Sequence, residues 1–197
     1  MNTFRPKSFP QNVGGPVVVW KDVFTPKELD AIEALGDALM PMRAEIAGRN
    51  TENTEKLRIT RVAWMERNPE TAWLHARLEE VALHLNKEFY SFDLYGLVEA
   101  FQYTVYDDQE GGHFGWHVDL GGNDVEPRKI SISLQLTDPE HYKGCELEVE
   151  AGHGCYVAER ARGALIAFPS YVLHRVTPIE SGIRKSLVIW ISGPAFR

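Results

Sequence analysis

The C-terminal half of this 197-residue chain is a series of short apolar segments separated by turn-forming residues, and this pattern restricts the folds open to it. Short strands at such regular spacing are typical of a β-sandwich or jelly roll. The expected strands cover residues 97–106, 114–119, 129–138, 145–150, 154–157, 164–168, 173–178 and 185–191. We therefore predict a β-rich core over 97–191.

Helical patterns precede these strands. Thr25 and Glu28 have the spacing of a capping box around Pro26, which predicts a helix start. The other expected elements are an irregular lead-in over 1–16, a buried strand over 17–20, a strand over 57–65 and a helix over 69–89. Helices first and strands afterwards predict one domain over 1–197, α+β but mainly β, in which 1–96 supply helical support and outer strands.

Residues 42–56 are polar and contain a long stretch with almost no apolar side chains. One interpretation is a solvated loop. The other is a lid over a binding pocket, because binding loops on a rigid scaffold often close over their ligand.

The composition is that of an ordinary globular protein, with 44% hydrophobic and 25% charged residues. The net charge of −7 argues against a nucleic-acid partner, which usually requires a basic surface. The chain shows neither a signal-peptide pattern nor an apolar run long enough for a membrane span, so we expect a cytoplasmic protein. In that reducing setting Cys145 and Cys155 are expected to be buried free thiols, with a disulfide as the alternative.

Three metal-ligand residues occur in a characteristic order. His117 and Asp119 are two residues apart on an expected strand, so their side chains project from the same face. His174 lies on a later strand. Two imidazoles and one carboxylate, with the other positions open, are the donor set of non-haem Fe(II) oxygenases. Arg184 follows ten residues after His174 and precedes an apolar strand, and arginine suits the bidentate recognition of a carboxylate.

In this order of residues the chain resembles the iron(II)- and 2-oxoglutarate-dependent dioxygenases, in particular their prolyl-4-hydroxylase-like branch, over about residues 97–191. The resemblance implies a double-stranded β-helix (jelly-roll) core that uses Fe(II), 2-oxoglutarate and O2, with ascorbate as a supporting reductant. It implies that Arg184 holds the distal carboxylate of 2-oxoglutarate, with a hydroxyl contact from Ser186. Tyr106 is expected to donate to the cosubstrate, and Gln135 stands where several relatives have a tyrosine that does so.

The same resemblance implies hydroxylation of an unactivated C–H bond of an amino-acid side chain, prolyl or other, free or in a peptide, with release of succinate and CO2. Asp119 excludes the halogenating relatives, in which a small residue leaves room for chloride. The alternatives are a nucleic-acid oxidative dealkylase on the same scaffold and a non-catalytic jelly-roll binder. A dealkylase would need a basic groove with an aromatic clamp, for which Arg58, Arg61, Arg67 and Trp64 are the candidates.

Several other residues bear on this hypothesis. Trp190 is expected either in the core or as a wall of the site, and Trp116 is expected to pack away from it. His113 and His153 are expected to be ordinary loop residues. Cys145 follows Gly144 where the family usually has a second glycine, which leaves the geometry of that turn open. The natural substrate, the carbon oxidised and the oligomeric state are not determined by the sequence.

Overall fold

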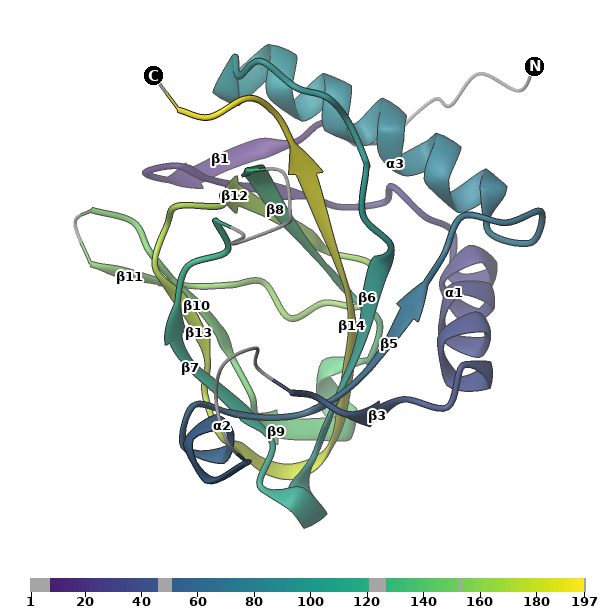
Figure 1. The fold of residues 1–197 in the computed structure, drawn as a ribbon, viewed down its shortest axis with the longest axis vertical. Coiled ribbons are helices and arrows are strands. Elements are labelled where there is room, and N and C mark those ends of the chain that lie inside the picture. Colours follow the sequence, from purple (N-terminus) through teal and green to yellow (C-terminus); the bar gives the residue numbers. More distant parts are fainter. Residues whose placement is uncertain (1–7, 46–50, 121–126, 153, 197) are drawn as a thin grey trace.

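The computed structural model describes residues 8–45, 51–120, 127–152 and 154–196, and it consists of two antiparallel sheets with helices against one of them (Figure 1). The larger sheet has the order β1 (Gln11–Gly14), β2 (Val17–Trp20), β12 (Leu165–Pro169), β8 (Arg128–Gln135), β14 (Ile179–Ser192), β6 (Phe101–Asp107), β5 (Arg61–Met65) and β3 (Met42–Arg43), and β9 (Tyr142–Gly144) pairs with β14. The smaller sheet has the order β11 (Cys155–Val157), β10 (Leu147–Glu150), β13 (His174–Val176), β7 (His113–His117) and β4 (Arg58–Ile59). The predicted jelly-roll core is confirmed.

Two helices cover the outer face of the larger sheet (Figure 1). These are α1 (Pro26–Ala38) and α3 (Ala72–Leu85), and a π-helical turn, Asn86–Tyr90, extends α3. The capping box predicted at Thr25 is present, with the Glu28 backbone N–H donating to the Thr25 hydroxyl and the Glu28 carboxylate accepting from the Thr25 backbone. The N-terminal helices therefore buttress the sheet as expected.

The alternation of side chains along β12 separates two hydrophobic clusters. Leu165 and Ala167 belong to the cluster that includes α1 and α3, whereas Ile166 and Phe168 belong to the cluster between the two sheets. Successive strand residues point to opposite faces, so a strand of the larger sheet is buried on both sides. This burial explains the nearly continuous apolar runs in the sequence.

The strand predicted over 57–65 is divided between the sheets. Arg58 and Ile59 pair with β7 in the smaller sheet, whereas β5 pairs with β6 in the larger one. Thr60 lies between them, is buried, and donates its hydroxyl to the backbone oxygen of Val105 at 2.9 Å. Because its hydroxyl is hydrogen-bonded, Thr60 can be buried at the point where the chain passes from one sheet to the other.

Other expectations need correction at the level of single elements. The polar segment 42–56 is not simply a loop, because it contains β3 and most of α2 (Thr51–Leu57), while 46–50 lie outside the described residues. The irregular lead-in contains β1, and β9 was not predicted. Two 3-10 turns, Asp108–Glu110 and Pro139–His141, complete the described elements.

Both cysteines are free, as expected, but only Cys145 is buried and Cys155 is exposed. Cys145 has a φ of 53°, in the left-handed region that favours glycine. It therefore adopts a backbone conformation suited to the glycine that the family usually has at this position. Gly144 before it also has a positive φ, and a Cβ there would lie 2.5 Å from the oxygen of Pro178. The turn therefore keeps its shape with a single glycine.

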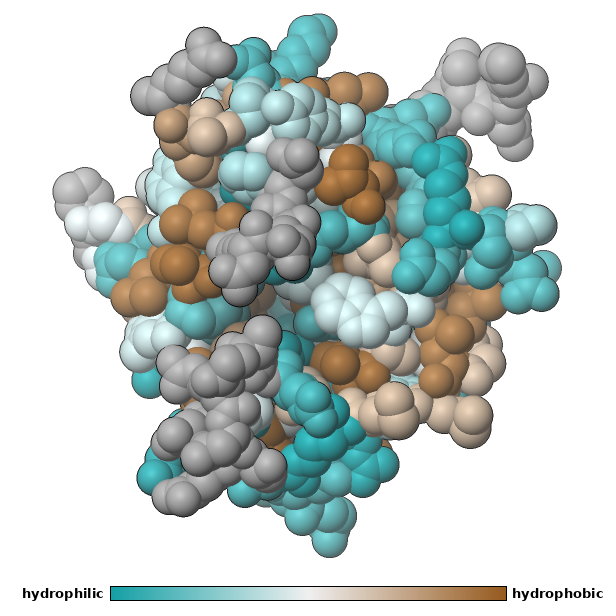
Figure 2. All heavy atoms as spheres, in the orientation of Figure 1, coloured by the Kyte–Doolittle hydropathy of each residue, from teal (hydrophilic) through white to brown (hydrophobic). Residues whose placement is uncertain are grey.

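The surface drawn in Figure 2 carries hydrophobic side chains in several small groups separated by hydrophilic ones. The large apolar side chains most exposed to solvent include Phe9, Met40 and Met42. Among the described helices, none combines the length and the apolar character needed to cross a membrane. The cytoplasmic location stays a prediction.

Candidate active site

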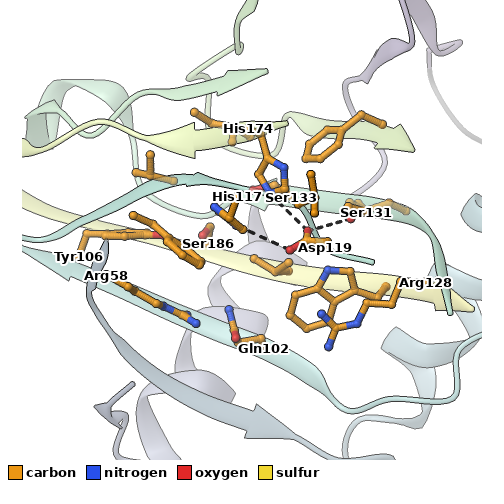
Figure 3. Close-up of a pocket in the computed structure, with 18 of the residues that line it drawn as sticks. Arg58, Gln102, Tyr106, His117, Asp119, Arg128, Ser131, Ser133, His174 and Ser186 are labelled. Atoms are coloured by element: carbon orange, nitrogen blue, oxygen red, sulfur yellow. Dashed lines mark hydrogen bonds and ion pairs between the residues drawn. The ribbon is translucent and has the colours of Figure 1, made fainter. Parts of the chain in front are cut away.

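A cavity of about 570 Å³ lies between the two sheets and is lined by side chains from both. His117, Asp119 and His174 line it from the side of the smaller sheet. Tyr106 and Arg184, on β6 and β14, line it from the larger sheet. Figure 3 shows the three ligand residues and Tyr106, from distant parts of the sequence, around one space.

The three predicted metal ligands converge. One donor atom from each of His117, Asp119 and His174 lies within 4.8 Å of the others. The two histidines are direct neighbours on the antiparallel strands β7 and β13. The carboxylate oxygens of Asp119 lie 3.7 Å from His117 Nε2 and 3.4 Å from His174 Nε2. Adjacent ligands that each lie about 2.1 Å from a metal are separated by about 3 Å, so these donors fit one ion with little movement.

The tautomer of each histidine follows from its hydrogen bonds. Nδ1 of His117 lies 2.8 Å from the backbone oxygen of Gly115, and Nδ1 of His174 lies 2.9 Å from that of Val172. A carbonyl oxygen only accepts, so each Nδ1 carries a hydrogen, and in the neutral ring Nε2 keeps a free lone pair. This is the usual way in which a backbone group orients a metal-binding histidine.

Asp119 lies two residues beyond the end of β7, so strand geometry alone does not aim it at the site. Its backbone N–H donates to the oxygen of Ser170 at 2.8 Å, and its Oδ2 accepts a hydrogen bond from the Ser131 hydroxyl at 2.8 Å. Burial opposes the charge on Asp119, but the adjacent His174 and His117 outweigh burial and hold its pKa well below the usual range. The carboxylate is therefore fixed and ionised, as a metal ligand must be.

The two histidines differ in their electrostatic surroundings. Burial and the nearby His174 lower the pKa of His117 to about 4, which keeps its imidazole neutral at physiological pH. Burial also lowers the pKa of His174, but the carboxylate of Asp119 outweighs it, so that the pKa lies above its usual value. A metal ion would have to displace a proton from His174 rather than from His117.

Arg184 is 1% exposed and lacks a carboxylate partner among the described residues. Its Nε and Nη2 donate to the side-chain oxygen of Gln135, at 3.2 and 2.9 Å, while its Nη1 has no hydrogen-bond partner. The neighbouring Cys145 does not balance the charge, because burial raises the pKa of its thiol. A buried guanidinium with an unused donor fits the distal carboxylate of 2-oxoglutarate.

The structure assigns the other predicted cosubstrate residues to different places. Tyr106 and Ser186 line the cavity beside Arg184, and burial raises the pKa of Tyr106 to about 12, so its phenol remains a donor. Gln135 requires a correction: it is not among the cavity-lining residues, and its amide N–H donates to the backbone oxygen of Glu159. Gln135 positions Arg184 instead of facing the cosubstrate.

The cavity has further lining residues that the sequence pointed to only in part. Ser131 and Ser133 of β8 line the cavity although neither was a predicted site residue, and Trp190 is a wall of it, one of the two places expected for this residue. Arg128 lies 3.7 Å above the Trp190 ring and pairs with Glu99.

Arg58 and His113 lie where the sequence did not place them, whereas Trp116 lies outside the cavity as expected. Arg58 lines the cavity because of the change of sheet at Thr60, which no sequence signal predicted. His113 is on β7 but does not line the cavity, and His153 lies outside the described residues. Trp116 does not line it either and packs against Arg175.

A jelly roll with two histidines and one carboxylate facing an open cavity defines the class of non-haem metal oxygenases. Residues 101–192 match the profile of the 2OG-Fe(II) oxygenase superfamily. A PKHD-type hydroxylase of Hyphomonas neptunium is 31% identical over 167 residues, which are 82% of this chain and 73% of that protein. The chain belongs to the 2OG-Fe(II) oxygenase superfamily, in its prolyl-4-hydroxylase-like branch.

Other similarities are more local or concern the fold. A PKHD-type hydroxylase of Acidovorax ebreus is 41% identical over 88 residues, 42% of this chain, and the match spans only 39% of that relative. The structure of a Pseudomonas putida prolyl-4-hydroxylase has a TM-score of 0.70 at 20% identity and covers 92% of this chain and 94% of its own. A Trichoplax adhaerens prolyl hydroxylase, solved with a hypoxia inducible factor peptide fragment, has a TM-score of 0.73 at 14% identity and covers 90% and 84%.

Proposed function

We propose that this protein is an Fe(II)- and 2-oxoglutarate-dependent dioxygenase that hydroxylates an amino-acid side chain, prolyl or other, free or in a peptide. The observation that carries the proposal is that one cavity is lined both by a possible metal-binding set and by an arginine suited to a carboxylate. The cavity holds a convergent His117, Asp119 and His174 set, and it also contains the buried Arg184, whose Nη1 has no partner.

His117, Asp119 and His174 would hold Fe(II) through two Nε2 atoms and a carboxylate oxygen. Arg184 would hold the distal carboxylate of 2-oxoglutarate, with hydroxyl donors from Tyr106 and Ser186. When bound, the metal and cosubstrate supply the oxidising power for attack on a C–H bond, with O2 as the oxidant and ascorbate as an external reductant.

The chain itself contributes orientation and exclusion of water. The Nδ1 bonds of both histidines fix the rings, and the Ser131 hydroxyl fixes Asp119. Apolar side chains, among them Phe168, Leu147 and Val176, line the cavity beside the ligands and keep water from surrounding them. No side chain is required as a nucleophile.

An amino-acid or peptide substrate is supported by the PKHD-type hydroxylases among the relatives and by the Trichoplax adhaerens prolyl hydroxylase, which was solved with a peptide fragment. The dealkylase alternative has less support, because two of its three candidate cations, Arg61 and Arg67, are already paired. Arg61 pairs with Glu110, and Arg67 pairs with Glu79 at 2.7 Å. Together with the net charge of −7, these pairs leave little basic surface for a nucleic acid.

The test is succinate release from 2-oxoglutarate in the presence of Fe(II), ascorbate and O2, with and without proline-containing peptides. We expect release by the wild type, stimulation by a suitable peptide, and loss of at least two orders of magnitude in Asp119→Ala.

The matched control is His113→Ala. This residue lies on the same strand as His117, and its Nδ1 also contacts a backbone oxygen, that of Gly111, at 2.9 Å, but it does not line the cavity. Unchanged release by Asp119→Ala, or equal losses in both variants, would contradict the proposed metal site. Absence of any release by the wild type would favour the non-catalytic binder.

A further inference from the structure

Arg58 is a second guanidinium at the cavity, and its position is set by the strand that carries a metal ligand. It pairs in register with Phe114 of β7 and lies 4.6 Å above the Phe114 ring. Phe114 in turn stacks on His117, with 3.5 Å between ring centroids. Figure 3 shows Arg58 on the side of the cavity opposite His174, directed toward Gln102.

The guanidinium of Arg58 has no polar partner among the described residues. Its Nε and Nη2 are buried and make no hydrogen bond. Glu45 also lines the cavity, but it is exposed and no ion pair joins it to Arg58. Burial lowers the pKa of Arg58, but arginine stays charged in proteins. A charge held in this way is costly unless a ligand supplies the missing acceptor.

Other arginines near Arg58 do have carboxylate partners. Arg128 lines the same cavity and also lies over an aromatic ring, but it forms an ion pair with Glu99. Arg61, three residues after Arg58, donates from Nε to Glu110 at 3.0 Å. Among the cavity-lining cations, only Arg58 and Arg184 lack a carboxylate partner within the described part of the chain.

If the proposed function is correct, the charges of a site that holds the metal and 2-oxoglutarate leave Arg58 without a negative partner. The two positive charges of a divalent ion and the one on Arg184 are matched by Asp119 and by the two carboxylates of 2-oxoglutarate. Arg58 would then remain without a carboxylate partner, because Glu45, the other acidic residue that lines the cavity, is exposed and forms no ion pair with it. The remaining ligand of such a site is the substrate, so the substrate is the group that can supply the negative charge.

We propose that Arg58 binds a carboxylate of the substrate, so that the substrate is an acidic amino acid or a peptide with a carboxylate near the oxidised carbon. A carboxylate matches the fork of a guanidinium with two parallel hydrogen bonds, which a neutral carbonyl does not. Phe114 contacts both the guanidinium of Arg58 and the ring of His117, so the strand that carries a metal ligand also positions Arg58.

The experiment uses the full chain loaded with Mn(II) and 2-oxoglutarate, which keeps the site occupied without turnover. The probes are acetyl-Pro-Asp-amide, acetyl-Asp-Pro-amide and acetyl-Gly-Pro, each compared by calorimetry with the analogue in which the carboxylate is an amide. We expect at least one acid to bind tenfold or more tightly than its amide in the wild type. Arg58→Gln should abolish that preference, and Arg58→Lys should restore part of it.

The control is Arg61→Gln, which removes an exposed arginine of the same segment and should keep the preference for the acid. Affinity for 2-oxoglutarate should stay within about twofold of the wild type in Arg58→Gln. Three results would overturn the proposal: equal binding of acids and amides, a preference that survives Arg58→Gln, or a selective loss of 2-oxoglutarate affinity. The last would make Arg58 a second cosubstrate anchor. Failure of the proposed function is distinguishable, because the wild type would then not bind 2-oxoglutarate.

Discussion

The two sheets make different contributions to the same cavity. The smaller sheet supplies His117 and His174 from β7 and β13, strands of five and three residues. The larger sheet supplies Arg184 from β14, a strand of fourteen residues that lies between β6 and β8. The metal site therefore belongs to the less extensive sheet and the expected cosubstrate anchor to the more extensive one.

This difference determines what holds each group. The histidines are positioned by local contacts, namely the Nδ1 bond of each ring and, for His117, stacking against Phe114. Arg184 is positioned by a strand paired on both sides and by Gln135 on the neighbouring strand. Substitutions at the metal ligands should therefore change function with little effect on folding, whereas substitutions around Arg184 should change both.

The largest effect is expected for His174→Ala. Removal of one of three ligands should reduce metal affinity by more than about 100-fold, because even groups that only orient a ligand contribute ten- to 100-fold. Above neutral pH, where the stabilising charge on His174 is lost, the apo protein should melt close to the wild type, since the smaller sheet keeps its backbone pairing. Metal titration and thermal unfolding of the same sample test both parts, and a large loss of apo stability would contradict the comparison.

Arg184→Gln should have the next largest effect, on 2-oxoglutarate rather than on the metal. Loss of a charged hydrogen-bond donor in a buried site corresponds to an increase in KM for 2-oxoglutarate of about ten- to 100-fold. Metal affinity should be unchanged, because Arg184 contacts no metal ligand. Steady-state kinetics at saturating metal give the answer, and an unchanged KM would place the anchor elsewhere.

These two groups of residues were not equally predictable from the sequence. Arg184 and Tyr106 were expected from the family resemblance and their order in the chain, and the period of two then placed Ser186 on the same strand face as Arg184. His117 and His174 were found from their chemistry and order, but their pairing as cross-strand neighbours required the structure. Asp119 faces the site through backbone bonds beyond the strand end, which the period of two does not describe.

The errors have a common physical origin in tertiary contacts. Gln135 has the spacing of a cosubstrate donor, but Arg184 and Glu159 already use its polar atoms. The switch at Thr60 depends on a hydrogen bond to Val105, a contact 45 residues away in sequence, so nothing local marked Arg58 as a cavity residue. The start of α1 and the apolar core were predictable because they depend on local capping and on residue type, whereas α2 was not predicted and α3 begins at Ala72 rather than at 69, without a side-chain cap.

The pH dependence of metal binding should be controlled by His174. Its pKa in the apo protein is raised by Asp119, so the proton that metal must displace is held on this side chain. As pH falls through that raised value, metal affinity should decrease, by up to about tenfold per unit. His117, with a pKa of about 4, should contribute only in stronger acid. Mn(II) titrations between pH 6 and 8 test this order.

The pKa shifts of His174 and Asp119 also affect the stability of the apo protein. For His174 the dependence of stability on pH has the opposite sign to that of metal affinity. A histidine whose pKa is raised by folding contributes stability below its unfolded pKa, and this contribution is lost as pH rises through the folded value. Asp119, whose pKa is lowered, contributes above its unfolded pKa and loses that contribution only in strong acid. Apo unfolding should therefore show a loss of stability on going above neutral pH that His174→Ala lacks.

The smallest effects are expected at two residues on one face of β8. One contacts a metal ligand and the other contacts Arg184. Ser131 and Gln135 are four residues apart, and both are buried. Ser131 donates to Asp119, whereas Gln135 accepts from Arg184. Ser131→Ala should weaken metal binding about tenfold and leave the KM for 2-oxoglutarate unchanged at saturating metal, because only the orientation of the carboxylate is lost.

Gln135→Leu is the matched variant, and it should change the KM for 2-oxoglutarate without changing metal affinity. Removal of its oxygen frees the guanidinium of Arg184 without changing its charge, so the KM for 2-oxoglutarate should rise a few-fold while metal affinity is retained. If both variants changed the same quantity, the metal ligands and the anchor would be one coupled network across the cavity. Opposite responses from one strand would show that the two sheets can be altered separately, even where their side chains meet.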